Sequence, residues 1–291
     1  MSVSRRTLVI ALDHCPGLGG VLIARTLARM DFQGWSADDL TALPPDTLIA
    51  EFRWPEPSAM LWLEHQKEWI ESAETFSRKL DQYGITLLSA ADAAFPAQIE
   101  QFDAEAPGLL YLYGNTKLVE ATTFAVMSSR KSPPGALDLI EALTEKEVLE
   151  GGTLVCGHNT PEYQRAAIVP LRWGSPRILA LDTGLFNALG SDLKQEPFRA
   201  ARLWRYQFDP HTDLVVSCEN PFAEGHKASN RKRDRLVAML AQRLHFVQIG
   251  EGGNMDRLAR RALQSGREVW VSDLTLNYRD YARLGAQITP A

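Results

Sequence analysis

The segment FAVMSSRKSPPG, residues 124–135, joins an apolar run to a short basic turn that is rich in hydroxyl groups. Ser128, Ser129 and Ser132 supply hydroxyl donors, and Arg130 and Lys131 supply two positive charges. Such donors at the end of a buried strand suit a phosphate, because one guanidinium can bind two of its oxygens at once. The segment therefore predicts an anion site, and its alternative is a strand followed by an ordinary polar loop.

Small and polar residues also follow four other apolar runs of the chain. These strand-end segments are 157–160, 182–184, 217–220 and 250–254. Ligands of an open parallel sheet bind beyond the carboxyl ends of its strands, so we expect the five segments to meet at one edge. Exposed backbone amides at that edge favour a phosphate, although glycine follows many buried strands for structural reasons alone.

A second group of cations lies in the segment HKASNRKRDR, residues 226–235, where five lysines and arginines accompany one aspartate. The whole chain of 291 residues carries a formal charge of −5, which argues against a protein covered by nucleic acid. Local charge steers a polyanion more than total charge does, so the cluster is a candidate binding element. The start of a solvated basic helix explains the same composition.

The sequence offers no convincing catalytic centre. It contains neither GxGxxG nor GxxxxGK[ST], and no HExxH or paired-carboxylate motif. His158 could act as a general base, but a histidine in a polar loop is more often structural. The cysteines Cys15, Cys156 and Cys218 are too far apart to indicate a zinc site or a disulfide framework. We therefore expect a binding protein of the cytoplasm rather than an enzyme, without cofactor or metal, and not bound to membranes.

The pattern from residue 84 onward predicts an α/β domain, residues 84–291. Apolar segments predicted as buried strands lie at 85–89, 108–114, 123–129, 151–157, 176–184, 213–218, 244–250 and 267–273, and helical patterns at 136–149, 162–173, 231–243 and 255–265. Strands that alternate with helices at this spacing indicate a Rossmann-like, mostly parallel sheet with helices on both faces.

The first 83 residues predict a small all-helical domain of the helix-hairpin-helix or SAM-like type. The turn PGLG, residues 16–19, joins two helical patterns, and a long amphipathic helix is expected at 59–83. Glycine amides in such a hairpin can approach a DNA phosphate. A purely structural hairpin is favoured slightly, because the region is acidic and the turn bears no lysine or arginine.

Eight motifs, in the right order over nearly the whole chain, resemble the DNA-processing protein A (DprA/Smf) family. They are FPAQIEQFDAEAPGLLYLYGN (95–115), FAVMSSRKSPPG (124–135, with Ser128 at a glycine position of the family), LVCG (154–157), RILALDTGL (177–185), VVSCENP (215–221), RDRLVAML (233–240), GGNMDRLARRALQSGREVWV (252–271) and NYRDYARLGAQI (277–288). The chain resembles a divergent member without the C-terminal winged-helix domain.

The resemblance implies a protein that grips the backbone of single-stranded DNA. It also implies action in recombination and natural transformation, presentation of DNA to a RecA-type recombinase, and a homodimer. The motif positions and the basic cluster give these candidate DNA- or phosphate-binding residues: Ser128, Ser129, Arg130, Lys131, Ser132, Gly157, Lys227, Arg231, Lys232, Arg233, Arg235, Gly252 and Gly253.

Two other functions remain open for the same scaffold. The net acidity suits a sensor of a nucleotide ligand, for instance in a defence or mobile-element locus. A phosphoribohydrolase of the related lysine-decarboxylase-like group is less favoured, because its PGGxGTxxE motif is absent and GEGGNMDRL is the nearest approach.

Overall fold

The computed structural model describes residues 2–102, 106–223 and 229–291. The chain divides into two compact units, Met1–Phe95 with Glu105–Tyr111, and Pro96–Ala104 with Leu112–Ala291. The domain boundary predicted between residues 83 and 84 coincides with the end of the helical region. The first unit itself continues beyond that point to include the strand β1 (Thr86–Ser89) and the start of β2 (Leu109–Gly114).

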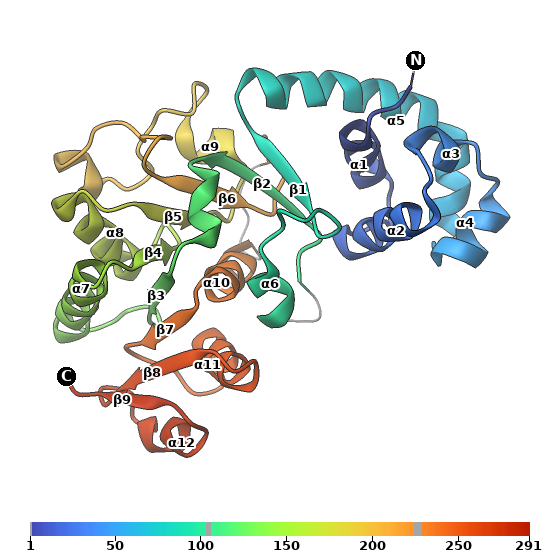
Figure 1. Cartoon of the computed structure of the whole chain (residues 1–291). Coiled ribbons are helices and arrows are strands. Elements are labelled where there is room, and N and C mark those ends of the chain that lie inside the picture. Colours follow the sequence, from blue (N-terminus) through green and yellow to red (C-terminus); the bar gives the residue numbers. More distant parts are fainter. Residues whose placement is uncertain (1, 103–105, 224–228) are drawn as a thin grey trace. The chain divides into compact units, whose positions relative to one another are not determined.

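The first unit begins with a helical region, as the sequence predicts, and this region contains five helices. They are α1 (Arg5–His14), α2 (Gly20–Gln33), α3 (Ala37–Thr41), α4 (Pro45–Phe52) and α5 (Glu56–Gln82) (Figure 1). The side chain of Ser4 caps α1 by accepting a hydrogen bond from the backbone N–H of Thr7. The long helix α5 starts three residues earlier than expected, with Pro57 in its first turn, where a missing N–H costs nothing.

Backbone conformation and close packing explain why glycines occur in the hairpin between α1 and α2. Gly17 has a φ of +86°, a conformation that side chains disfavour. A Cβ at Gly20 would lie 2.9 Å from the backbone nitrogen of Gly108, so two backbone segments can touch only without a side chain there. Gly19 faces open space. Packing inside the first unit therefore accounts for two of the glycines, which favours the structural interpretation of the hairpin.

The sheet contains all eight predicted strands and one more. Its strand order is β1-β2-β6-β5-β4-β3-β7-β8-β9, and the pairs from β6 to β9 are all parallel. The strands beyond β2 are β3 (Thr123–Met127), β4 (Thr153–Cys156), β5 (Arg177–Ala180), β6 (Leu214–Ser217), β7 (Arg243–Phe246), β8 (Glu268–Ser272) and β9 (Gln287–Thr289). The prediction of a mostly parallel sheet is confirmed. The three residues of β9 were missed because they are short of buried side chains.

Most of the helices of the second unit lie between these strands. They are α6 (Ala97–Phe102), α7 (Pro134–Leu149), α8 (Pro161–Trp173), α9 (Leu185–Leu189), α10 (Ser229–Leu240), α11 (Asn254–Gln264) and α12 (Tyr278–Arg283), with 3-10 turns η1 (Thr116–Glu120) and η2 (Ala200–Leu203). The prediction that helix continues over 241–243 was wrong. Arg243 pairs with Phe124 of β3 instead, and sheet pairing overrides the helical pattern there.

The order of the strands reverses between the neighbours β3 and β7. The chain runs from β3 through α7 to β4 on one side, and from β7 through α11 to β8 on the other (Figure 1). Right-handed crossovers then place α7 and α8 on one face and α10 and α11 on the other. The carboxyl ends of β3 and β7 therefore flank a topological switch point, where open α/β sheets bind their ligands.

Candidate functional site

The loop after β3 is folded by its own serines. Ser132 donates its hydroxyl proton to the carbonyl oxygen of Ser129 at 2.8 Å, and the hydroxyls of Ser128 and Ser132 lie 2.9 Å apart. Because the proton of Ser132 is already used, Ser128 must donate within that pair. The two hydroxyls predicted to bind phosphate thus hold the loop together.

Ser129 differs from the other two serines. Its hydroxyl oxygen accepts the backbone N–H of Gly250 at 2.9 Å, and its backbone N–H donates to the carbonyl of Gln248. These bonds join the loops after β3 and β7 across the switch point. No acceptor for the hydroxyl proton of Ser129 lies among the described residues, so this proton is available to a ligand.

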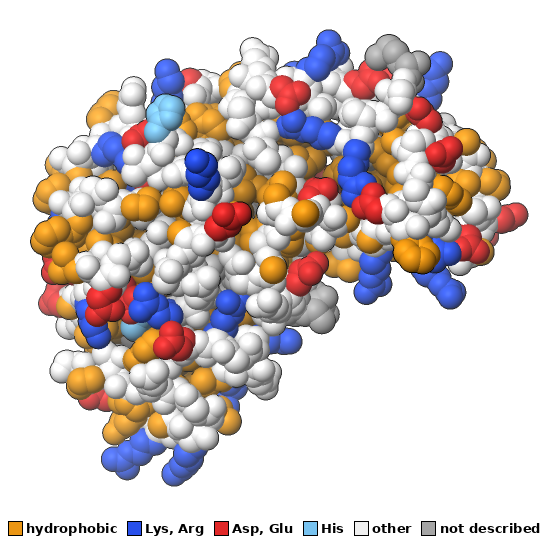
Figure 2. Space-filling view, viewed as in Figure 1, with side chains coloured by type: hydrophobic (Ala, Val, Ile, Leu, Met, Phe, Trp, Pro, Cys, Tyr) orange, Lys and Arg blue, Asp and Glu red, His pale blue; other side chains and the backbone are white. Residues whose placement is uncertain are grey.

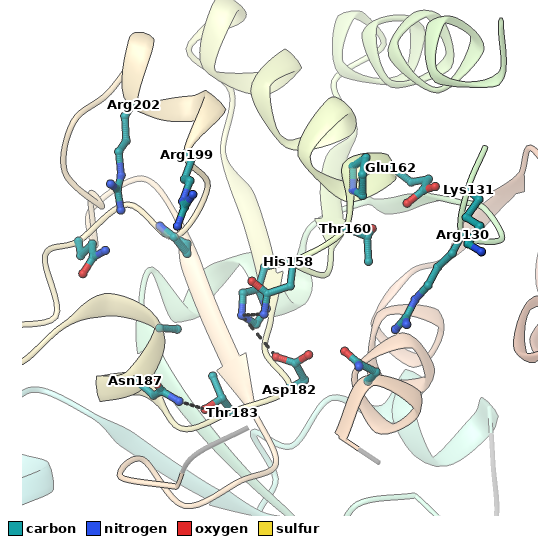
Figure 3. A pocket seen from close by; sticks show the side chains of 16 residues that line it. Arg130, Lys131, His158, Thr160, Glu162, Asp182, Thr183, Asn187, Arg199 and Arg202 are labelled. Atoms are coloured by element: carbon teal, nitrogen blue, oxygen red, sulfur yellow. Dashed lines mark hydrogen bonds and ion pairs between the residues drawn. The ribbon is translucent and has the colours of Figure 1, made fainter. Parts of the chain in front are cut away.

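The same loop exposes two cations beside a cavity of about 940 Å³. Lys131 has a φ of +66°, which turns the chain sharply after Arg130. Figure 3 shows Arg130 reaching into the cavity from this loop, opposite Arg199 and Arg202 from the segment between β5 and β6. In the described part of the chain, neither Arg130 nor Lys131 has a hydrogen bond or ion pair. The remaining lining residues are His158, Asn159, Thr160, Pro161, Glu162, Asp182, Thr183, Asn187, Ala188, Gln195, Pro197 and Asn230.

A second cavity of about 450 Å³ lies at the switch point itself and shares Arg130, Thr160 and Asn230 with the first. It is also lined by Ser128, Ser129, Tyr163, Arg231, Arg233, Asp234, Asn254 and Met255. The two cavities therefore meet at Arg130. The first turns of α8, α10 and α11 each contribute residues to this region, and the positive end of a helix dipole favours an anion. In α8 itself, Pro161 has no N–H and the N–H of Tyr163 already donates to the Thr160 hydroxyl.

Arg233 is buried in the wall between the strands and the cavities. Its guanidinium donates to Asp182 at 2.9 Å, to Asp234 at 2.9 Å and to the carbonyl of His158 at 2.8 Å. Burial alone would lower the pKa of Arg233, but Asp234 and Asp182 raise it above its ordinary value. Its positive charge is therefore engaged inside the protein.

Asp234 is oriented inward by four donor atoms. Besides two nitrogens of Arg233, the hydroxyl of Tyr163 donates to it at 3.0 Å and the side-chain amide of Asn254 at 2.9 Å. Gly157 makes this network possible, because a Cβ there would lie 2.7 Å from both Arg233 and Tyr163. Gly157 thus contributes by having no side chain, which leaves space for that of Arg233.

His158 and Asp182 lie in the larger cavity, with Nε2 of the imidazole 3.4 Å from a carboxylate oxygen (Figure 3). Burial lowers the pKa of His158 to about 4, although the Asp182 carboxylate acts in the opposite direction. A neutral imidazole at physiological pH adds no positive charge to the site. Among the described residues, no hydrogen bond joins either side chain to a serine, threonine or cysteine that it could activate as a nucleophile.

The other residues predicted to bind DNA or phosphate differ in whether they line a cavity. Arg231 is exposed and lines the smaller cavity, whereas Lys232 pairs with Glu219 at 3.0 Å. Gly252 has a φ of +65° and Gly253 precedes α11 as its cap. Arg235 lines neither cavity. Lys227 lies outside the described residues.

Sequence reasoning missed Arg199 and Arg202. Both belong to the segment EPFRAARLWRY, residues 196–206, in which three arginines recur at every third position. That spacing was a usable signal, but the segment follows no predicted strand directly. Asn230 and Asn254, which also line the site, were hidden inside the basic cluster and the glycine-rich turn.

The charge of the two cavities differs from that of the chain. Their lining holds six arginines and lysines against three carboxylates, although the chain as a whole is acidic. On the face shown in Figure 2, basic and acidic side chains are interspersed. The local excess of positive charge therefore marks the carboxyl edge of the sheet as a place for an anion.

The described residues give little sign of other chemistry. All three cysteines are free, and burial raises the pKa of Cys156 to about 12, which keeps it a thiol. No group of three metal-ligating side chains occurs in residues 2–102, 106–223 and 229–291. No helix within these ranges is long and apolar enough to cross a membrane.

A family model for DNA recombination-mediator protein A matches residues 86–286, which include the whole site. The chain belongs to this family. The match begins at β1 and ends just before β9. The resemblance drawn from the eight motifs is thereby confirmed.

Solved structures of this family share the fold. DNA processing protein A (DprA) from Streptococcus pneumoniae is 19% identical, with a TM-score of 0.76 over 99% of this chain and 95% of its own. The DNA processing protein A of Helicobacter pylori, whose single-stranded DNA binding mode was the subject of that structure, is 19% identical, with a TM-score of 0.54 over 70% of this chain and 90% of its own. No curated protein matched the sequence.

Proposed function

We propose that this protein binds single-stranded DNA at the carboxyl edge of its sheet and acts in DNA recombination. The observation that carries the proposal is Arg130, an exposed cation at the junction of two cavities that has no partner in the part of the chain that the structure describes. Membership of the DNA recombination-mediator protein A family and the binding described for the Helicobacter pylori protein support it.

The lining residues suit recognition of the phosphate backbone. Arg130 and Arg231 offer guanidinium groups, Ser129 offers a hydroxyl proton, and the first turns of α10 and α11 offer the positive ends of their dipoles. None of these groups distinguishes one base from another, so the expected binding depends little on sequence. Arg233 and Asp234 would support this surface from behind rather than contact phosphate themselves.

The test is a titration of a labelled oligothymidylate with the parent protein and Arg130→Gln, at several salt concentrations. Charge-assisted hydrogen bonds contribute about 1.5–3 kcal/mol, so we expect Arg130→Gln to weaken binding roughly 10- to 100-fold. The slope of log affinity against log salt should fall by about 0.7 for each lost phosphate contact.

Arg283→Gln is the matched control, because Arg283 is 78% exposed on α12 and lines neither cavity. It should bind as the parent does. Absent or salt-insensitive binding by the parent would contradict the proposal. Displacement of the DNA by a nucleoside monophosphate at similar concentration would instead favour a nucleotide sensor.

We infer further that the protein is a cytoplasmic homodimer without enzymatic activity that presents DNA to a RecA-type recombinase, including during natural transformation. Family membership is the support for this inference. Light scattering after size exclusion measures the dimer, and pull-down with a RecA-type recombinase measures the partner. A monomer at micromolar concentration, or no recombinase retained, would contradict the respective part.

A further inference from the structure

The segment between β5 and β6 brings two arginines to the larger cavity, opposite the loop after β3. Arg199 and Arg202 line the same cavity as Arg130 and Lys131, and Figure 3 shows them entering it from the other side. The side chain of Arg199 has no hydrogen bond or ion pair within the described residues. Among the same residues, the Arg202 guanidinium donates only to the carbonyl oxygen of Glu196, at 3.2 and 3.3 Å, and to no carboxylate.

A buried ion cluster fixes the position of this segment. Glu196 is fully buried and accepts a hydrogen bond from Arg177 at 2.9 Å, while its backbone carbonyl holds Arg202. Phe198 is 1% exposed and lies under the guanidinium of Arg177. Glu196 and Phe198, on either side of Pro197, are thus anchored to Arg177 of β5. Their contacts fix the start of the segment that carries Arg199 and Arg202.

Four cations line one cavity, and none of them pairs with a carboxylate among the described residues. Glu162 and Asp182 line it too, but they accept hydrogen bonds from Ser132 and Arg233 instead. Other arginines of the second unit, such as Arg165, Arg172 and Arg243, are paired with glutamates or aspartates. Like charges that face a common cavity repel one another, and a bound anion removes that repulsion. An anion on one wall alone would leave the opposite pair uncompensated.

We propose that Arg199 and Arg202 form the second wall of a clamp, so that single-stranded DNA passes between them and Arg130. The proposal rests on the proposed function and extends it along the strand. Since Arg130 borders both cavities, a strand held at the switch point continues past it into the larger cavity. There its next phosphates meet Arg199 and Arg202. The ligand is therefore a polyanion of several nucleotides rather than a single phosphate group.

The clamp is tested by oligonucleotide length. Oligothymidylates of increasing length, from a dinucleotide to about 20 nucleotides, are titrated against the parent, Arg199→Gln and the double variant Arg199→Gln with Arg202→Gln. The double variant should bind the shortest oligonucleotides as the parent does and lose roughly tenfold or more with long ones. Two lost phosphate contacts should lower the salt slope for long strands by about 1.4.

Two controls keep the outcomes distinct. The double variant Arg279→Gln with Arg283→Gln removes the same charge from α12 and should leave binding unchanged at every length. The Arg199 side chain has no partner among the described residues, so Arg199→Gln should unfold at the parent's midpoint and still show part of the loss in affinity. Two outcomes would overturn the clamp. In the first, Arg130→Gln weakens binding as proposed above, while the Arg199 and Arg202 variants keep the parent's affinity at all lengths and salt concentrations; the proposed function would then stand without the clamp. In the second, the double variant loses the same affinity for short strands as for long ones.

Discussion

Two buried arginines of the second unit, Arg177 and Arg233, each contact two carboxylates, yet their surroundings differ. Arg177 donates to Asp213 at 2.6 Å and to Glu196 at 2.9 Å, and the three side chains are all fully buried. Arg233 donates to Asp182 and Asp234, whose side chains are 9% and 10% exposed at the cavities. The carboxylates of the first cluster also pair with Arg205, whose side chain is 23% exposed. The first cluster is closed to both cavities, whereas the second forms part of their wall.

The two clusters show which arginines of the second unit stabilise the fold and which remain for binding an anion. In both clusters burial would lower the pKa of the arginine, and its carboxylates raise it instead, so both guanidinium groups are positively charged and internally compensated. Such charges hold elements together but add little to the attraction of an anion. That attraction is left to the cavity cations that pair with no carboxylate in the described ranges, which are Arg130, Lys131, Arg199 and Arg202.

Removal of Arg177 should give the largest effect on stability. Arg177→Met leaves Glu196 and Asp213 buried without their main donor, and breaking a buried pair costs about 3–5 kcal/mol. Urea unfolding measures the change, and Arg283→Met is the control, because an exposed ion pair contributes about 0–1 kcal/mol. A midpoint equal to that of the control would show that the closed cluster does not stabilise the fold.

Arg233→Met should have a smaller effect on stability and an added effect on binding. We expect a loss of about 2–4 kcal/mol, because Asp182 and Asp234 can regain some contact with water. The two carboxylates would then face the cavities uncompensated, so affinity for single-stranded DNA should fall. Arg177→Met should retain the parent's affinity at temperatures where it is folded. Loss of affinity for DNA in both Arg177→Met and Arg233→Met would contradict the proposal that only the cluster around Arg233 supports binding.

Much of this fold could be predicted from the sequence, because its strands are buried on both faces and read as short apolar runs. All four residues of β4, β5 and β6 are buried, and each was recognised. Strand β9 and helices α9 and α12 were missed, since three to six residues with mixed burial leave no periodic pattern.

The sequence predicted the site in part, because it does not show which cations of the site are paired with carboxylates. The sequence identified Arg130 and the loop around it, because hydroxyl and basic residues directly follow a strand. It could not tell that Arg233 is neutralised by Asp182, 51 positions earlier in the chain, or that the Arg199 side chain pairs with none of the residues that the structure describes. Whether an arginine binds a ligand or a carboxylate depends on contacts between distant segments, which local composition does not contain.

The two clusters should also differ in acid, because His158 shares Asp182 with Arg233. Burial lowers the pKa of His158 to about 4, below its ordinary value of 6.5, so the unfolded chain binds a proton more readily. Stability from this group is complete above pH 6.5 and decreases as the pH falls toward 4. Asp182 and Arg233 are the charged groups that face the imidazole.

His158→Gln therefore tests the network at the cavity without touching the closed cluster. Between pH 7 and pH 5 the parent should lose about 2 kcal/mol more than the variant in the free energy of unfolding. Urea titrations at both pH values measure the difference, with Arg283→Gln as a control that keeps the parent's dependence. An identical pH dependence in His158→Gln and the parent would mean that His158 does not link acid to the cluster around Arg233, and the comparison would then rest on burial alone.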